Sequence, residues 1–525
     1  MTVFFVLIGI VLATVAMVVI GEKTGLPWPA LLTVLVMGVV FIPGMPSIEI
    51  PADYILPLFL PPLLWSLAWQ TSWGVIRDQW ITILVLSVLL VIATALGVGA
   101  AAYFLMPSFG VLAAIVIGAA VAPPDPVAVE AVSDSAGIPK RIMRALQTEG
   151  LFNDAASIVV FHLALTALLQ RDELRIGVVL ADFVYSAVVA VVVGLGIGYA
   201  TVFVLERIDN TTARRVLNWV VPFAAYVLAE ELGASGVIAV VVAAIQTNSR
   251  ASFEAEDRLS GQFFWATVDM LFTGIAFGLI GLTLNTAVYE AGMMLWHAVG
   301  VGVILALVAL VIRFVFMYGF YRLNKHRGKY YAAPMTAREV LLMTWSGMRG
   351  LVTLALVLSI PAAVFPAHNE LAIIAIVVLV MTMVVPGLLL PELVKWLKVG
   401  TGSSARADEM RNLVGLKARE AALGVLRDYR DVLDPETVSV LQYWFDTRLL
   451  SSVELNLDAT SKREHISDEM VLAHNVRRKA IRAAQDELIQ LRNRRGVSPN
   501  IVDEVLSEVD QLAVISERLS HHQHH

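Results

Sequence analysis

Three polar residues stand together at the start of a long apolar segment, where they could bind a cation or a proton. Glu149, Asn153 and Asp154 lie within residues 147–157, and the apolar run 155–169 follows them. An ionisable side chain inside a membrane segment costs about 2.5–3.5 kcal/mol on insertion scales, so such residues usually serve a function. We predict that Asp154 binds either a proton or a metal cation and carries it between the two sides of a membrane.

The composition of the chain indicates a membrane protein. Of its 525 residues 58% are hydrophobic and 16% are charged, and the mean hydropathy is +0.75. Soluble proteins have about 45–50% apolar and about 25% charged residues. We predict an all-α polytopic membrane protein with no nucleic-acid partner. The chain has no cysteine, which excludes disulfides, thiolate zinc sites and iron–sulfur clusters.

Thirteen segments are apolar enough to be membrane spans, each of which needs about 20 mostly apolar residues. They are residues 2–20, 28–43, 52–70, 80–105, 109–131, 145–169, 176–205, 214–231, 234–248, 260–283, 293–322, 338–360 and 369–396. The eighth and ninth segments contain four charged residues, so they form either two spans, one long helix or an interfacial hairpin.

The basic residues of the loops predict the orientation of the spans. The odd-numbered loops contain Lys23, Arg77, Lys140, Arg141, Arg144, Arg207, Arg214, Arg215, Arg250, Arg258, Arg322, Lys325, Arg327 and Lys329. The even-numbered loops contain only Arg171 and Arg175. Since positive residues stay on the cytoplasmic side, we predict an external N-terminus, a cytoplasmic C-terminus and a location in the plasma (inner) membrane.

The composition changes after residue 400, and the sequence predicts two domains. Residues 1–400 form the membrane domain, and residues 401–525 form a charged, helix-rich cytoplasmic tail with a regulatory or oligomer-supporting role. Residues 449–460 are less regular. The tail ends in four histidines, for which a solvated terminus is favoured over weak metal binding: His521, His522, His524 and His525.

Two spans are interrupted by residues that break helices. Span five contains Ala122, Pro123, Pro124, Asp125 and Pro126 in succession. Prolines so close together remove backbone donors and clash with preceding carbonyls, so they cannot lie in a continuous helix. A simple kink in a packed helix is the structural alternative, and three prolines around an aspartate favour a functional break.

Span twelve has the second interruption, at residues 346–350, where glycines surround Arg349. Non-helical backbone at membrane depth is tolerated only inside protein or beside a cavity. Paired interrupted segments in two halves of a chain are typical of inverted-repeat transporters with a site near the midplane. The spacing of seven spans gives the two interrupted helices opposite topology.

The charged residues of these segments predict a division of roles. At about 100° per residue Glu149 and Asn153 share one helix face, and Ser157 shares the face of Asp154. Glu149 and Arg349 suit a structural ion pair, because a lone buried charge is costly.

Two further residues can form hydrogen bonds with the broken backbone. Asp154 therefore remains as the carrier. Asn153 can hold the break through its amide, and Asp125 can cap the free amides of a half-helix. Asp154 then has no fixed partner, as a reversible carrier requires. Burial favours its protonated form and a bound cation favours its carboxylate, so the two cargoes compete. A helix N-cap is the structural alternative for Asp154, and a hydrogen-bonded core position is the favoured interpretation for His162.

The chain resembles the cation:proton antiporter family over about residues 1–400, specifically its electroneutral sodium/proton exchanger branch. The segments that carry the resemblance are 59–63, 125–129, 149–154, 229–236, 277–284 and 347–350. The resemblance implies thirteen spans, a homodimer, and a six-helix core that moves as an elevator against a dimerisation domain. It also implies that Asn153–Asp154 is the carrier pair and that Glu149–Arg349 is the family's ion pair.

Three positions depart from the family pattern. Pro124 replaces the threonine before the aspartate of the broken helix, Gly150 replaces the serine after the glutamate, and Ser66 replaces an acid. We expect the cation to be bound by Asp154, by water and by backbone carbonyls near Ala122 and Pro123. Ser157 and Ser66 are accessory candidates. The departures leave the choice between sodium and potassium open.

The leading hypothesis is electroneutral exchange of one monovalent cation for one proton, without a cofactor. The cation is sodium most readily, with potassium or lithium as alternatives. A cation- or pH-sensing receptor built on a transporter core is a second hypothesis, but residues 401–525 contain no catalytic or phosphotransfer motif. No motif of a membrane hydrolase occurs, so we do not expect an enzyme.

Overall fold

The structure is a computed structural model of the 525-residue chain. It describes residues 2–40, 52–69, 71–170, 176–208, 210–250, 255–291, 294–326, 334–360, 368–399, 405–448, 468–492, 494 and 497–521. Within these ranges the chain is helical and contains no strand. The predicted all-α polytopic class is confirmed. The irregular segment 449–460 and His522, His524 and His525 lie outside the described residues.

Eleven helices and helical pieces lead up to and through the stretch that contains Asp154. They are α1 (Thr2–Thr24), α2 (Trp28–Val40), α3 (Ala52–Trp69), α4 (Trp73–Ile83), the π-helix η1 (Leu84–Leu89), α5 (Leu90–Leu105), the 3-10 turn η2 (Pro107–Phe109), α6 (Gly110–Val121), α7 (Val127–Glu130), α8 (Ser133–Ala136) and α9 (Lys140–Gln170).

The second half of the membrane region repeats this use of long and broken helices. Its elements are α10 (Ile176–Leu205), α11 (Thr211–Glu231), α12 (Gly236–Arg250), α13 (Ala255–Ala291), α14 (Leu295–His326), α15 (Ala337–Trp345), α16 (Leu351–Leu358), α17 (His368–Leu379), the π-helix η4 (Val380–Val384) and α18 (Val385–Leu397).

Seven of the described helical stretches are long and apolar enough to cross a membrane, and three shorter apolar helices accompany them. The count of thirteen spans remains a prediction. Residues 214–248 form two helices, α11 and α12, joined by a turn in which Gly233 has φ +67°. The interpretation as one long helix is therefore wrong.

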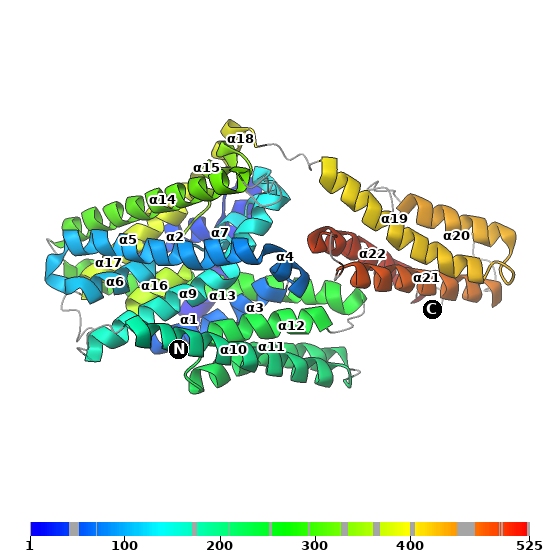
Figure 1. The fold of residues 1–525 in the computed structure, drawn as a ribbon, viewed down its shortest axis with the longest axis horizontal. Helices are drawn as coiled ribbons and strands as arrows, with labels where there is room; N and C mark the ends of the chain where they lie inside the picture. Colours follow the sequence, from blue (N-terminus) through cyan, green and yellow to red (C-terminus); the bar gives the residue numbers. More distant parts are fainter. Residues whose placement is uncertain are drawn as a thin grey trace. The chain divides into compact units, whose positions relative to one another are not determined.

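The membrane helices pack as two bundles (Figure 1). The first bundle comprises α1, α3 and α10–α13: α10 packs on α11 and α12, and these two pack on α3. Helix α2 packs on α1 and on η4, so it joins this bundle to the second. The rings of Phe59 and Phe272 meet at 5.8 Å and those of Trp219 and Trp265 at 6.3 Å, which joins α13 to α3 and α11. Gly274 of α13 lies against Thr14 of α1.

The second bundle comprises η1, α5, α6, α9 and α14–α18. Helix α5 packs on α6 and α14, α6 packs on α9, and α14 packs on α17. The contact of α5 with α6 depends on glycine, because a Cβ at Gly118 would lie 2.0 Å from the carbonyl oxygen of Ala95. Small residues bring helix backbones together in this way in membranes. Both interrupted helices belong to this bundle.

The chain forms two compact units, and the second includes the tail. It consists of Gly402–His525 together with two short segments, Ser72–Asp78 and Ala251–Phe264. The predicted boundary at residue 400 assigned these two segments to the membrane domain. They are the N-terminal ends of α4 and α13, whose remaining turns belong to the first unit.

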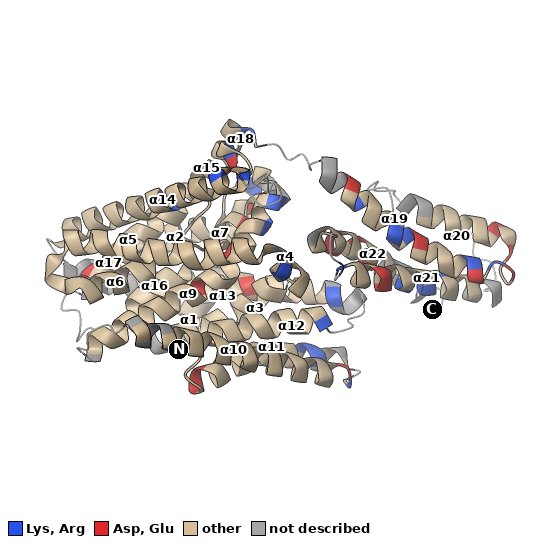
Figure 2. Ribbon diagram, viewed as in Figure 1, with Lys and Arg blue, Asp and Glu red and all other residues tan. Residues whose placement is uncertain are grey.

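Four helices make up the described part of the tail: α19 (Ala405–Asp428), α20 (Pro435–Arg448), α21 (Asp468–Arg492) and α22 (Pro499–His521). They enclose a core of their own, which includes Val414, Phe445, Leu488 and Val505. Charged residues are spread along α19 and α21, whereas long stretches of α5, α10 and α14 carry none (Figure 2).

Candidate cation and proton site

The proline-rich break of span five separates α6, which ends at Val121, from α7, which begins at Val127. The amide of Asp125 donates to the carbonyl of Met348 at 2.6 Å, so the two broken segments are hydrogen-bonded to each other. The Asp125 carboxylate accepts from the amide of Val127 at 2.9 Å and from the amide of Leu351. These amides belong to the N-terminal ends of α7 and α16. The cap predicted for Asp125 is present, and it serves both half-helices.

Glycine is required where the second break passes Asp125. A Cβ at Gly350 would lie 1.6 Å from Asp125 Oδ2, which no side chain can satisfy. Helix α15 therefore ends at Trp345 and α16 begins at Leu351, with a non-helical segment between them. The predicted interruption of span twelve is confirmed, and the carboxylate of span five fills the space that the missing side chain leaves.

Arg349 stabilises the broken backbone and does not pair with Glu149. Its Nε donates to the carbonyl of Val121 at 2.8 Å, and its Nη1 donates to the carbonyl of Gly347 at 2.8 Å. The Val121 carbonyl lies at the C-terminal end of α6, where the helix dipole is negative and carbonyls lack helical partners. A buried guanidinium supplies both the donors and the positive charge that this end needs.

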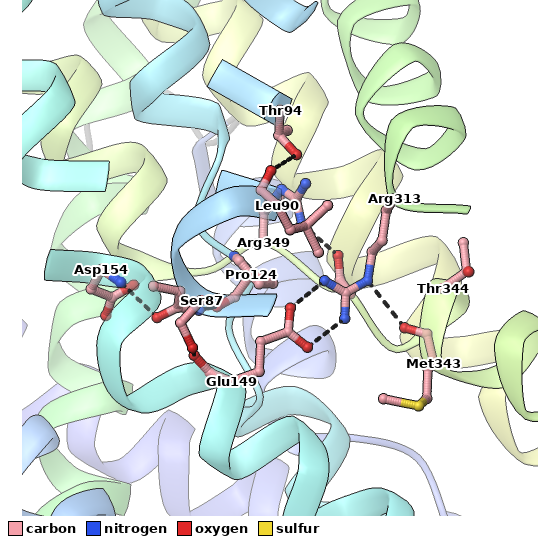
Figure 3. A network of polar contacts seen from close by, with 12 residues as sticks. Ser87, Leu90, Thr94, Pro124, Glu149, Asp154, Arg313, Met343, Thr344 and Arg349 are labelled. Atoms are coloured by element: carbon pink, nitrogen blue, oxygen red, sulfur yellow. Dashed lines mark hydrogen bonds and ion pairs between the residues drawn. The ribbon is translucent and has the colours of Figure 1, made fainter. Parts of the chain in front are cut away.

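The partner of Glu149 is Arg313 of α14, so the predicted pair Glu149–Arg349 is wrong. Arg313 Nη1 and Nη2 donate to the two carboxylate oxygens at 2.5 and 2.9 Å (Figure 3). Both side chains are 2% exposed, and Arg313 Nε donates to the carbonyl of Met343 at 3.1 Å. Gly347 makes room for this guanidinium, because a Cβ there would lie 2.1 Å from Arg313 Nε.

Asn153 connects the carrier helix to the break. Its Nδ2 donates a short hydrogen bond to the carbonyl of Pro124, as the sequence predicted, and its Oδ1 accepts from the amide of Asp154 at 2.6 Å. Ser157 donates to the carbonyl of Ala119 at 2.8 Å, which ties α9 to α6. Its hydroxyl is thus engaged in helix packing.

Asp154 is the acid of this group whose side chain is left without a fixed partner. It lies in the middle of α9, so the alternative of a helix N-cap is wrong. The side chain is partly exposed and interacts electrostatically with Asp125 beside the proline-rich break. Within the described ranges neither of its carboxylate oxygens accepts a hydrogen bond.

The structure explains one departure from the family pattern. A Cβ at Gly150 would lie 2.9 Å from Cγ and 3.1 Å from Cδ of Pro126. The proline ring occupies the space that a serine side chain would need. Gly150 is therefore required by the packing of Pro126 against it.

Two residues lie elsewhere than the sequence suggested. Ser66 is at the contact of α3 with α13, where its hydroxyl donates to the carbonyl of Trp265 at 3.5 Å. His162 is exposed on the surface of the protein, with its ring edge-on to Phe161 at 5.7 Å. The prediction of a core position for His162 is wrong, because α9 turns this face away from its neighbours.

One acid near the break was missed. Asp269 of α13 interacts electrostatically with Glu130 and Asp125, and it lies one turn beyond Trp265 in the first bundle. No hydrogen bond or ion pair to its carboxylate occurs among the residues that the structure describes. It is an ionisable residue in the apolar segment 260–283, the same signal that identified Asp154.

These features together define a class of protein. Two broken helices cross inside a membrane bundle, their free ends are compensated by Asp125 and Arg349, and an unpaired carboxylate lies beside them. Paired interrupted helices of this kind are typical of secondary transporters.

Comparison with known proteins agrees with this class and gives the family. Residues 1–396 match the family model "Sodium/hydrogen exchanger, transmembrane", and the chain belongs to this family. It is 26% identical over 498 residues to the uncharacterized Na(+)/H(+) exchanger YjcE of Escherichia coli, covering 89% of this chain and 90% of that one. It is 30% identical over 371 residues to the low-affinity Na(+)/H(+) antiporter NhaS1 of Synechocystis, covering 69% and 68%.

A solved structure has the same fold. The sodium proton antiporter MjNhaP1 of Methanocaldococcus jannaschii superposes with a TM-score of 0.57 at 19% identity, over 76% of this chain and 99% of that chain. The predicted membership of the sodium/proton exchangers is confirmed. The protein is a transmembrane ion transporter that exchanges cations for protons.

The ion pair of Glu149 can be tested by stability. Arg313→Met leaves a buried carboxylate unpaired, and we expect it to lower the free energy of unfolding by about 3–5 kcal/mol. Adding Glu149→Gln should recover part of this loss, as measured by thermal unfolding in detergent. The matched pair Arg349→Met with Glu149→Gln should show no such recovery; recovery there would contradict the assignment.

Proposed function

We propose that the protein exchanges one sodium ion for one proton, with Asp154 as the shared site of both. The observation that carries this proposal is the unpartnered Asp154 carboxylate in the second bundle, where the charges of Asp125, Arg349 and Glu149 are already matched. Asp125 is bonded to two amides, Arg349 to two carbonyls and Glu149 to Arg313. Asp154 alone can change its charge without leaving one of these groups unpaired.

The proposed stoichiometry follows from the pairing of charges. If only the proton-loaded and the cation-loaded forms of Asp154 cross the membrane, both are neutral at this residue and the exchange is electrically silent. Two positive charges would need a second free carboxylate in the moving part. Asn153, which cannot ionise, occupies the adjacent position and is hydrogen-bonded to Pro124.

Coordination of the cation is proposed to depend on few side chains. Among the described residues no three Asp, Glu or His side chains gather closely enough to hold a metal ion. Backbone carbonyls near Ala122 and Pro123, together with water, complete the shell around Asp154. Potassium is the second candidate cation, because Pro124 and Gly150 supply no hydroxyl ligand. A relative from Bacillus pumilus, 29% identical over 364 residues, is named a sodium, potassium, lithium and rubidium/H(+) antiporter.

The proposed movement is an elevator in which the second bundle slides against the first. Both breaks and Asp154 lie in the second bundle, so the site moves as a unit. The external N-terminus, the cytoplasmic C-terminus, the plasma-membrane location and a homodimer formed through the first bundle complete the proposal.

The central test uses vesicles that contain the purified protein. Asp154→Asn should abolish sodium-driven proton movement while the variant folds as the wild type does, because the amide carries neither cargo. Glu392→Gln is the control, since Glu392 is exposed and paired with Lys395 within one helix turn. Retained exchange in Asp154→Asn would refute the carrier, and flux that follows a clamped membrane potential would refute the one-for-one stoichiometry. Parallel arms with potassium and lithium determine the cation preference.

Asp269 is proposed to act from the first bundle as a fixed negative charge that attracts the cation. Asp269→Asn should raise the apparent KM for sodium severalfold and change kcat little, because the carrier itself remains. Asp182→Asn, on α10, is the matched control. A loss of kcat at unchanged KM would contradict a role in attraction.

A further inference from the structure

The hydroxyl of Thr273 on α13 is buried and has no hydrogen-bond partner among the residues that the structure describes. Thr273 is 3% exposed. Other buried threonines of the membrane helices donate to the carbonyl four residues before them at 2.8 Å, as Thr14, Thr94 and Thr247 do. A buried hydroxyl without a partner is costly. The Thr273 oxygen is therefore available to a ligand that these parts of the chain do not supply.

Asp269 lies one helical turn before Thr273, on the same face of α13. Residues four apart on a helix are neighbours, with Cβ atoms about 5–6 Å apart. The Asp269 side chain is partly exposed, so an ion can reach it, and its carboxylate has no hydrogen bond or ion pair within the described ranges. Hard cations are bound by oxygen ligands. A carboxylate and a hydroxyl, both without partners, are thus placed together on one helix face.

Aromatic rings pack beside this pair. Trp265, one turn before Asp269, has its ring centroid 6.2 Å from that of Trp65 on α3 and 6.3 Å from that of Trp219 on α11. Apolar surroundings strengthen the attraction between a carboxylate and a cation, because the effective dielectric constant is low. The indole N–H of Trp65 is buried and has no acceptor in the described part of the chain. It can donate to a water molecule that also binds a cation.

The acids that interact with Asp269 belong to the second bundle. They are Glu130 of α7 and Asp125 of the proline-rich break, and Asp125 interacts in turn with Asp154. Asp269 and Asp154 are thus linked electrostatically through the same residue of the break. A cation held at Asp269 is attracted towards the carrier by the negative charges of the second bundle.

We propose that Asp269 and Thr273 form a second cation site, which lies in the first bundle and binds sodium directly before the ion reaches Asp154. The inference rests on the proposed function, and it deepens the role of Asp269 from attraction at a distance to coordination. The Asp269 carboxylate, the Thr273 hydroxyl and water supply the ligands. Because the site stays with the first bundle during the proposed movement, it loads the carrier only when the break faces α13.

Equilibrium binding of radioactive sodium to the purified protein separates the two sites without transport. Asp154→Asn removes the carrier site, and this variant should still bind sodium saturably. Adding Asp269→Asn or Thr273→Val should weaken the remaining binding severalfold or abolish it, because each change removes a ligand oxygen. Thr247→Val in the same background is the matched control, since the buried Thr247 hydroxyl is bonded to the carbonyl of Ala243 within α12.

Thr273→Val in the otherwise unchanged protein separates coordination from attraction by charge. Valine replaces the hydroxyl by a methyl group of similar size and leaves the Asp269 carboxylate in place. Attraction by charge alone predicts an unchanged apparent KM for sodium in vesicles. Direct coordination predicts a KM raised severalfold with little change in kcat, and Thr247→Val should leave both unchanged.

Two results would overturn the second site and leave the proposed function standing. One is an Asp154→Asn protein that unfolds thermally as the wild type does but binds no sodium saturably. The other is sodium binding by Asp154→Asn that is unaffected by Thr273→Val. Sodium/proton exchange retained by Asp154→Asn would instead overturn the proposed function, and the loading of the carrier from Asp269 with it.

Discussion

The backbone groups set free at the two helix breaks are the constraint on which the structure depends. In a membrane interior no bulk water can satisfy them, so the protein must do so. Asp125 binds the amides of two half-helix N-termini, and Arg349 binds the carbonyl that ends α6. The acidic Asp125 therefore lies at the positive N-terminal ends of two half-helices, and the cationic Arg349 lies at the negative C-terminal end of α6. Both charges compensate helix termini.

This arrangement isolates Asp154. Glu149 forms an ion pair with Arg313, and Asn153 donates a hydrogen bond to the carbonyl of Pro124. A carboxylate inside a membrane bundle that has no partner is costly when it is ionised, unless a cation or a proton joins it. In the proposed function, the site binds one of two cargoes because the pairing of Glu149, Asn153, Asp125 and Arg349 leaves the Asp154 carboxylate unmatched. The same reasoning explains why Ser157, which is bonded to Ala119, contributes to packing.

Much of the site could be predicted from the sequence because its signals are local. Three prolines around Asp125 and the glycines around Arg349 identify the breaks, and Asn153 lies one turn before Ser157 on the helix that faces them. The partner of Glu149 could not be chosen locally. Two arginines, Arg313 and Arg349, lie in later spans, and only the packing of α14 and the space at Gly347 decide between them. Arg313 does carry a signal of its own in the sequence, because it is a cation within the apolar span 293–322.

The fold was predictable for a similar reason. The length of each apolar run indicates a membrane helix, and the charged composition after residue 400 indicates a separate tail. The contacts of Gly74 and Arg258 with the tail helices were not predictable, because each joins residues more than 200 positions apart: Gly74 lies against Pro499, and Arg258 pairs with Asp510. Asp269 was missed although its signal was the same as that of Asp154. An acid near the middle of an apolar segment can be recognised from the sequence as a candidate ion-site residue. Its role depends on neighbouring residues from other helices, which only the structure shows.

The central claim is that sodium and the proton compete for one carboxylate. It is tested most directly by the apparent KM for sodium measured over a range of pH in vesicles at zero membrane potential. Competition of one proton with one cation predicts that the KM rises about tenfold for each unit of falling pH on the acidic limb, while the maximal rate is regained at high sodium. A KM that is independent of pH, with only the maximal rate falling in acid, would show that the proton acts at another site and would contradict the account.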